Sequence, residues 1–348
     1  MSVTRMRVAA AAVAAVALLA GCAASGSGKV MILQVTERET VEADKGEVPE
    51  PDMPLVWPLT GVPTSEVADR PAMSVKIENS AAARPQTGLG EADVVWEEMV
   101  EGGITRFNAV YHSQIPSELG PIRSLRPMDA AISGPFGGLF VFSGGQARFV
   151  NQVASTGLTM LSHDGGDAGF YRTSDRVAPH NVYGDPETFL AAGEGQDPPP
   201  TQFEFALDAE GATALDGEAT SSIAIAFPSS SPGWSWDGDA WERTEGGQPA
   251  MTADSGQITS VNVVVLRVQV RNSGAVDPGG NPVPETILTG SGEATVFSGG
   301  HRIDATWSKS EVGSVLVLST ADDEPVHLAP GNVWVELVPV SGGSVSAS

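Results

Sequence analysis

The sequence has little cysteine, few positive charges and no long apolar run, and each shortage excludes a class of protein. Its 348 residues include one cysteine, Cys22, so no disulfide can form within one copy of the chain. The formal charge of −24 at pH 7 argues against general affinity for nucleic acid or for an anionic membrane surface. No apolar stretch is long enough to span a bilayer. The motifs G-x-S-x-G and S-x-x-K are also missing, so no familiar serine nucleophile can be identified.

The single cysteine ends a recognisable signal. Two arginines precede a short apolar run at 8–20, and the sequence Leu-Ala-Gly leads directly to Cys22. This order is typical of a bacterial lipoprotein signal peptide, which is cut before a cysteine that carries two acyl chains and so anchors stably. We therefore expect residues 1–21 to be a signal peptide and Cys22 to hold the protein on the extracytoplasmic face of the cell membrane. The alternative is an ordinary secretory signal or an uncleaved helix.

Composition indicates an α+β protein with a mixed or antiparallel sheet and a few short helices in its N-terminal part, and with a β-rich C-terminal part. The 40 glycines and 25 prolines favour many turns and short strands over long helices. Short helices are predicted at 128–132, at 146–155 and after Asp185. We predict four segments after the signal peptide: a flexible tether at 22–54, an N-terminal α+β domain at 55–197, a C-terminal antiparallel β domain at 198–341, and a disordered tail at 342–348.

Residues 92–112 form the stretch around which the functional residues are expected to gather. Two apolar-rich runs flank Gly102 and Gly103, which is the pattern of a hairpin with a two-residue turn. That turn pairs Glu98 with Phe107, so that Glu98 lies on the apolar face of the hairpin.

Four arginines in and around this hairpin are the candidates for binding an anion: Arg84, Arg106, Arg123 and Arg126. No lysine lies between the first and the last of them, and the planar guanidinium suits bidentate capture of a carboxylate or phosphate. The alternative is internal pairing, for which the predicted register gives Arg106 two partners, Glu97 and Glu101.

Further polar residues could form other parts of the same cleft: Glu98, Asp129, Arg172, His180 and Asn181. A buried Glu98 would have a raised pKa, as a general acid often does, although a core ion pair with an arginine is the alternative that we favour. Asp129 is a further partner for the arginines, and His180 is either a general base or a structural group. No metal-ligand spacing is present, so neither a metal nor a cofactor is expected.

Long stretches of the chain resemble the YerB-like lipoproteins, a bacterial family described as a domain of unknown function. The motifs that carry the resemblance lie at 70–127, which ends in ELGPIRSLRP, at 170–185 (FYRTSDRVAPHNVYGD), at 290–311 and at 328–339. The resemblance implies an α+β fold, a β-rich second half and a lipid anchor. It implies no activity, so it assigns no catalytic residues.

These observations lead to one main hypothesis and one alternative. The main hypothesis is a non-catalytic binding or assembly factor of the cell envelope, which holds an anionic or glycan-like ligand or a partner protein. The alternative is an envelope hydrolase or transferase that uses Glu98, Asp129 or His180 together with the arginines. A scaffolding role comes third.

Overall fold

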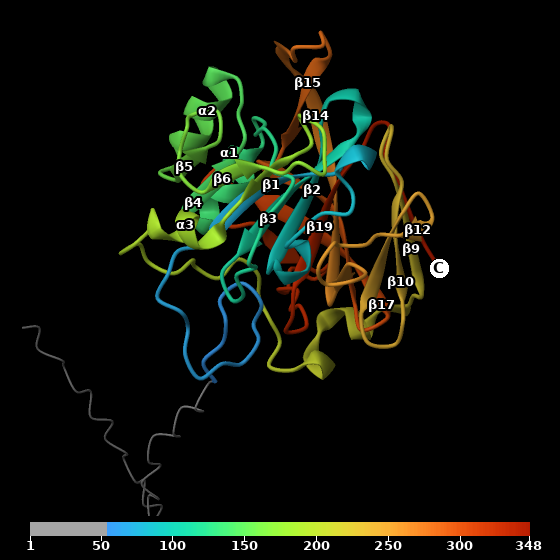
Figure 1. Cartoon of the computed structure of the whole chain (residues 1–348). Helices are drawn as coiled ribbons and strands as arrows, with labels where there is room; N and C mark the ends of the chain where they lie inside the picture. The colour runs from blue at the N-terminus through green and yellow to red at the C-terminus, as the bar shows by residue number, and fades with distance from the viewer. Residues whose placement is uncertain (1–53) are drawn as a thin grey trace, which may run out of the picture. The chain divides into compact units, whose positions relative to one another are not determined.

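Two β-sheets and a few short helices make up most of residues 54–348, which are the residues that the computed structural model describes (Figure 1). The predicted signal peptide, Cys22 and nearly all of the predicted tether lie outside these residues. The larger sheet has twelve strands and is mixed, the smaller has six strands, and a separate ribbon has two. The predicted α+β class is therefore confirmed.

The twelve-stranded sheet contains strands from both halves of the sequence. Its main path runs in the order β18-β17-β16-β14-β19-β2-β3-β1-β4-β5, with β15 paired to β14 and β8 to β17. The strands of the first half are β1 (Met73–Glu78), β2 (Val94–Met99), β3 (Thr105–Tyr111), β4 (Leu139–Phe142) and β5 (Thr159–Ser162). Those of the second half are β8 (Glu218–Ala219), β14 (Asn262–Val276), β15 (Pro282–Ile287), β16 (Gly290–Ser298), β17 (His301–Lys309), β18 (Val317–Ser319) and β19 (Val333–Pro339).

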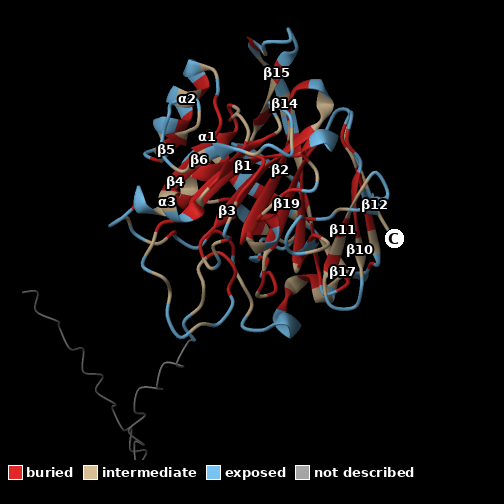
Figure 2. Ribbon diagram, viewed as in Figure 1, coloured by how far each residue is buried: buried red, intermediate tan, exposed pale blue. Residues whose placement is uncertain are grey.

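The two halves of the sequence meet where β19 lies between β14 and β2. It runs parallel to both of them, and Val333 and Glu336 lie opposite Val94 and Glu97 of β2. Figure 2 shows that buried residues cover β1, β2, β3 and β19 almost continuously, which is typical of strands packed on both faces. The proline- and glycine-rich segment near residue 197 thus divides the sequence, whereas the sheet continues across both halves.

The six-stranded sheet comes from the second half of the sequence and is antiparallel throughout. Its strands are β9 (Ser222–Ala226), β10 (Pro232–Trp236), β11 (Trp241–Glu245), β12 (Gln248–Pro249), β13 (Thr259–Ser260) and β20 (Ser344–Ala347). The last of these corrects the prediction of a disordered tail at 342–348. The tail is ordered because its backbone pairs with the free edge of β9, from Ser344 opposite Ala226 to Ala347 opposite Ile223.

The helices are short and fall where the sequence predicts them. They are α1 (Asp129–Ser133), α2 (Ala147–Ala154) and α3 (Pro186–Ala191), and the side chain of Asp185 caps α3 by accepting from the Glu187 amide at 3.1 Å. The two-stranded ribbon is β6 (Phe170–Arg172) with β7 (Val182–Gly184). Single 3₁₀ turns lie at Ala81–Ala83, Leu89–Glu91, Glu101–Gly103, Gly134–Phe136, Ala209–Gly211 and Thr213–Asp216. Across residues 54–348, no helix has the length and apolarity needed to cross a membrane.

A buried arginine of the small sheet contacts the large sheet where its two halves join. Arg243 of β11 lies within 2.7 Å of Glu97 and within 3.0 Å of Glu336, and all three side chains are almost completely buried. Its guanidinium also lies over the ring of Trp334, 4.7 Å from the centroid. Burial and the neighbouring Glu97 raise the pKa of Glu336, so this carboxyl group holds its proton more strongly than usual.

The predicted hairpin is confirmed, but its predicted register is wrong by one residue. Glu98 lies opposite Arg106, not opposite Phe107. The cause is the turn, which contains three residues, Glu101–Gly103, and is closed by a hydrogen bond from the Val100 amide to the Ile104 carbonyl at 2.8 Å. Because side chains alternate along a strand, this shift places Glu98 and Arg106 on one face, and Glu97 and Phe107 on the other.

The two turn glycines provide a test of this geometry. Both have positive φ, 74° at Gly102 and 73° at Gly103, so replacement of either by alanine should cost about 1 kcal/mol in the free energy of unfolding. A β-carbon at Gly103 would also lie 2.7 Å from Cβ of Pro228, whereas one at Gly102 would meet nothing within 4 Å. Gly103→Ala should therefore destabilise the protein by roughly 1–3 kcal/mol more than Gly102→Ala in urea unfolding. Equal losses would contradict the packing of this turn against the second half.

Candidate functional site

The register of β1, β3 and β2 gathers charged side chains on one face of the large sheet. Glu78 lies opposite Arg106, which in turn lies opposite Glu98, and Lys76 lies opposite Asn108. These side chains alternate with the apolar residues of the opposite face. We call this set, Lys76, Glu78, Glu98, Arg106 and Asn108, the charged face.

The segment 120–127, which carries Arg123 and Arg126 and which we call the arginine turn, lies at the edge of this charged face. The Arg123 amide donates to the Lys76 carbonyl at 2.8 Å, and Ile122 forms a β-bridge with Ile77. The chain around Ile122 therefore runs beside β1 as a short extra strand. Alternation along it places Ile122 on the apolar face with Ile77, and Arg123 on the charged face with Glu78.

At the centre of the charged face, Glu98 has a different partner from the arginine that the sequence suggests. Lys76 Nζ contacts both Glu98 and Asp129, with 2.8 Å to the second, and all three side chains are fully buried. Asp129 also accepts from the Asn108 amide group at 2.8 Å and from the Arg126 backbone amide at 2.6 Å. It therefore pairs with a lysine and a backbone group, not with a guanidinium.

Arg106 and Arg126 are both used within the protein. The Arg126 guanidinium makes a two-pronged contact with Glu101, at 2.6 Å from Nε and 2.5 Å from Nη2. Arg106 donates to the Ser124 carbonyl at 2.7 Å and has no carboxylate within 4 Å among the residues described. Burial and the charges of Arg126 and Arg123 lower the pKa of Arg106 to about 9, although Glu101 acts in the opposite direction. The sequence paired Arg106 with Glu97 and Glu101; the corrected register turns Glu97 to the other face, and Glu101 binds Arg126.

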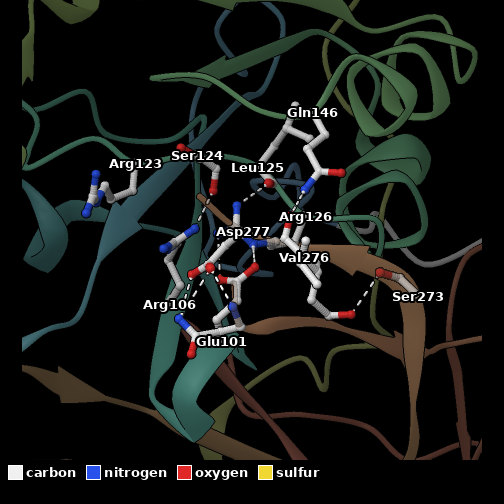
Figure 3. Close-up of polar contacts among 12 residues, drawn as sticks. Glu101, Arg106, Arg123, Ser124, Leu125, Arg126, Gln146, Ser273, Val276 and Asp277 are labelled. Carbon is white, nitrogen blue, oxygen red and sulfur yellow. Dashed lines mark hydrogen bonds and ion pairs between the residues drawn. The ribbon is translucent and has the colours of Figure 1, made fainter. Parts of the chain in front are cut away.

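Carboxylates also surround the small cavity beside Arg126. This cavity of about 280 Å³ lies between the arginine turn and the tip of the β14–β15 ribbon, and Glu101, Asp164 and Asp277 all line it. Gln146 links its rim to the ribbon by donating to the Val276 carbonyl at 2.8 Å (Figure 3). Three carboxylates and one paired guanidinium make this cavity unsuitable for an anion.

Arg123 and His180 are arranged differently, because they share one buried carboxylate and remain partly open to solvent. Arg123 Nε lies 3.2 Å from Glu78 Oε2, and His180 Nδ1 lies 2.8 Å from Glu78 Oε1. Their side chains are 23% and 27% exposed, against 5% for Glu78. Ser80 Oγ donates to the same Oε1 at 2.8 Å. Figure 3 shows the Arg123 guanidinium directed away from the Glu101–Arg126 pair.

The other candidate residues lie outside this group. Arg84 donates to the side chain and the carbonyl of Asn79, at 3.0 and 2.7 Å, and belongs to the apolar face of the sheet. Arg172 donates to Asn181 at 2.7 Å, and Asn181 donates to the Thr173 carbonyl at 2.9 Å, so this pair ties the β6–β7 ribbon. The nine candidates therefore form several separate clusters instead of one cleft. No group of three or more potential metal ligands occurs in the part of the chain that the structure describes.

Three residues that organise the charged face were missed in the sequence: Lys76, Glu78 and Glu101. The alternation of AMSVKIE indicates a strand, and two charges on one face of a buried strand are themselves a signal of a paired polar layer. The sequence indicates Glu101 only as a partner of Arg106.

Comparison with known families accounts for most of the described chain. The profile for the N-terminal domain of "Protein of unknown function (DUF3048)" matches residues 59–199, and that for its C-terminal domain matches residues 223–335. The chain belongs to the DUF3048 family. This confirms the resemblance read from the motifs, and the boundary between the two DUF3048 profiles lies near the division predicted from composition.

One relative and one solved structure are similar to this chain over most of its length. The chain is 27% identical over 303 residues to "Putative lipoprotein YerB" of Bacillus subtilis (strain 168), covering 85% of this chain and 89% of that protein. A crystal structure of the YerB protein from Bacillus subtilis superimposes with a TM-score of 0.70 at 25% identity, covering 84% of this chain and 99% of that one. Neither name includes an activity.

The buried Lys76–Glu98–Asp129 cluster predicts a pH dependence of stability. Burial and the charge of Asp129 raise the pKa of Glu98 from 4.5 to about 7, against the opposing effect of Lys76. Between these two values the folded chain binds more protons than the unfolded chain, so the free energy of unfolding falls as the pH rises from 4.5 to 7. Glu98→Gln should reduce this fall by roughly 1–3 kcal/mol in urea unfolding at a series of pH values.

The control for this measurement is Glu293→Gln, because Glu293 lies on an exposed part of β16. It should leave the pH profile of the unmodified protein unchanged. If Glu98→Gln gave the same profile as the unmodified protein, the proton on Glu98 would not contribute to the fold.

Proposed function

We propose that the protein is a lipid-anchored protein of the cell envelope that binds an anionic group between Arg123 and His180 without transforming it. The anchor is supported by the signal ahead of Cys22 and by the likeness to a protein named as a lipoprotein. The ligand group that fits is a carboxylate or a phosphate, such as that of a uronic acid or a phosphorylated sugar.

The observation that carries this proposal is the set of side-chain nitrogens left without a partner around Glu78. The terminal nitrogens of Arg123 and Nε2 of His180 make no hydrogen bond to any described residue. Behind them, Glu78 contacts His180 Nδ1 at hydrogen-bond distance and forms an ion pair with Arg123 Nε. When the imidazole is protonated, Nε2 is a donor toward an anion. A guanidinium held in this way can offer its two terminal groups to an oxyanion with little loss of conformational freedom. Arg126 uses all three nitrogens of its guanidinium within the protein, and Arg106, which donates only from Nη1, is buried away from solvent.

Catalysis is the second candidate, because Glu78 and His180 have the geometry of an oriented base. A carboxylate on Nδ1 fixes the imidazole and leaves Nε2 to take a proton. The nearest hydroxyl, Ser80 Oγ, lies on the wrong side for this, 3.5 Å from Nδ1 and hydrogen-bonded to Glu78. Among residues 54–348, no hydroxyl or thiol lies within hydrogen-bond reach of Nε2, so binding is the better-supported function.

The anion site predicts binding of glucuronate and of inorganic phosphate. The purified protein in neutral-lipid nanodiscs should bind both in isothermal titration, and Arg123→Ala and His180→Ala should each weaken binding by about tenfold, as loss of one charge-assisted hydrogen bond does. Arg302→Ala is the control, because Arg302 pairs with Glu218 on the exposed surface of the second half. Binding that is absent, or that all three variants weaken equally, would overturn the anion site.

The lipid anchor predicts acylation at one position. Cells that express the protein should incorporate an alkyne-labelled fatty acid into it, and Cys22→Ser should abolish the label because the acceptor thiol is lost. Ser25→Ala, which leaves the residues up to Cys22 intact, should be labelled normally. Equal labelling of the Cys22→Ser protein would exclude this anchor.

A further inference from the structure

The opposite face of the same strands holds a cavity that the anion site does not use. Its volume is about 450 Å³, and it lies between the loop that follows β1 and the strands β11–β13 of the small sheet. Phe107, which alternates with Arg106 along β3, lines its wall together with Ile258, Met251, Pro85 and Pro249. This volume lies within the usual range for small-molecule sites, which combine apolar walls with a few polar groups.

One polar group in this cavity is fixed and has a donor to spare. Arg84 is held by Asn79, which accepts from Nε at 3.0 Å and from Nη2 at 2.7 Å, and Nη2 lies 3.3 Å from Glu245. Nη1 makes no hydrogen bond within residues 54–348, and the side chain is 32% exposed. The guanidinium is therefore oriented in advance, with one amino group available to a ligand.

The carboxylate beside Arg84 also has other partners. Glu245 lies 3.2 Å from the buried Arg243 and accepts from the Ser230 hydroxyl at 2.9 Å. Because Arg243 and Ser230 share the charge of Glu245 with Arg84, the guanidinium of Arg84 keeps part of its attraction for an acid.

Residues from both halves of the sequence hold the cavity open. Gln86 forms a β-bridge with Thr252, and its carbonyl accepts from the Ala253 amide at 2.7 Å. The Gly88 amide donates to Asp254 at 2.7 Å. Met251, between these contacts and the cavity, is 46% exposed and forms part of the rim. The walls are therefore fixed by backbone contacts, while a flexible thioether lies at the entrance.

We propose that this cavity binds a small amphipathic acid, with its apolar body against Phe107, Ile258 and Met251 and its acid group on Arg84. The charge at one end and the apolar walls elsewhere select for this combination: a purely polar anion gains nothing from the walls, and a neutral apolar molecule gains nothing from Arg84. The site is separate from the Arg123–His180 site, on the other face of β1 and β3.

A matched pair of probes tests this site. The protein in neutral-lipid nanodiscs, with its Met and Ile methyl groups labelled with ¹³C, is titrated with 4-phenylbutyrate and with 4-phenylbutanol, which share one apolar body and differ in charge. Phenylbutyrate should shift the Met251 and Ile258 methyl signals and bind more tightly than phenylbutanol. Arg84→Gln should weaken phenylbutyrate roughly tenfold, as loss of a charge-assisted hydrogen bond does, and leave phenylbutanol unchanged.

Two controls separate this site from the anion site and from general unfolding. His180→Ala should leave the affinity for phenylbutyrate unchanged, and inorganic phosphate should not shift the Met251 signal. The methyl spectrum of Arg84→Gln away from the cavity should match that of the unmodified protein. Equal affinity of the two probes for the unmodified protein, or shifts that miss both Met251 and Ile258, would overturn the proposal.

Discussion

The ion cluster around Arg243 is the constraint on which the rest of the arrangement depends. Its two closest carboxylates, on Glu97 and Glu336, lie side by side on β2 and β19, the parallel pair where the two halves of the sequence meet. An arginine from the small sheet thus contacts carboxyl groups contributed by both halves of the large one. Trp234 adds a hydrogen bond to Glu336 at 3.0 Å. Removing one member would leave charges buried without a partner, which is far more costly than never burying them.

Ion pairs are buried on both faces of the large sheet, and their positions fix the register in which its strands pair. On one face Lys76 lies between Glu98 and Asp129, and on the other Arg243 lies between Glu97 and Glu336. A shift of β2 by one residue would place Met99 or Trp96 opposite one of the two cations, where a glutamate now lies. Such buried pairs add little net stability, but here they select one register among several that apolar packing alone would tolerate.

The features of this fold that can be predicted from the sequence are those with a local cause. The α+β class, the helix capped by Asp185 and the turn glycines follow from local patterns and are confirmed. The register of the hairpin depends on whether its turn holds two or three residues, and Gly102-Gly103 suits both. Because the sequence does not decide between these two turns, the predicted partners of Arg106 and the predicted face of Glu97 are wrong. The partners of Arg243, and the pairing of Ser344–Ala347 with β9, join residues far apart in the chain, and no local pattern reports them.

The position of β19 also has a consequence for how the chain reaches its fold. This strand lies close to the C-terminus, yet it fills the gap between β2, from the first third of the chain, and β14. Until β19 has formed, β2 and β14 each expose an edge of unpaired backbone groups, which can pair with strands of other chains. A polypeptide released or cut before Val333 cannot complete its central sheet, so folding of the N-terminal strands has to wait for nearly the whole sequence. High contact order of this kind slows folding and lengthens the period in which aggregation competes with it.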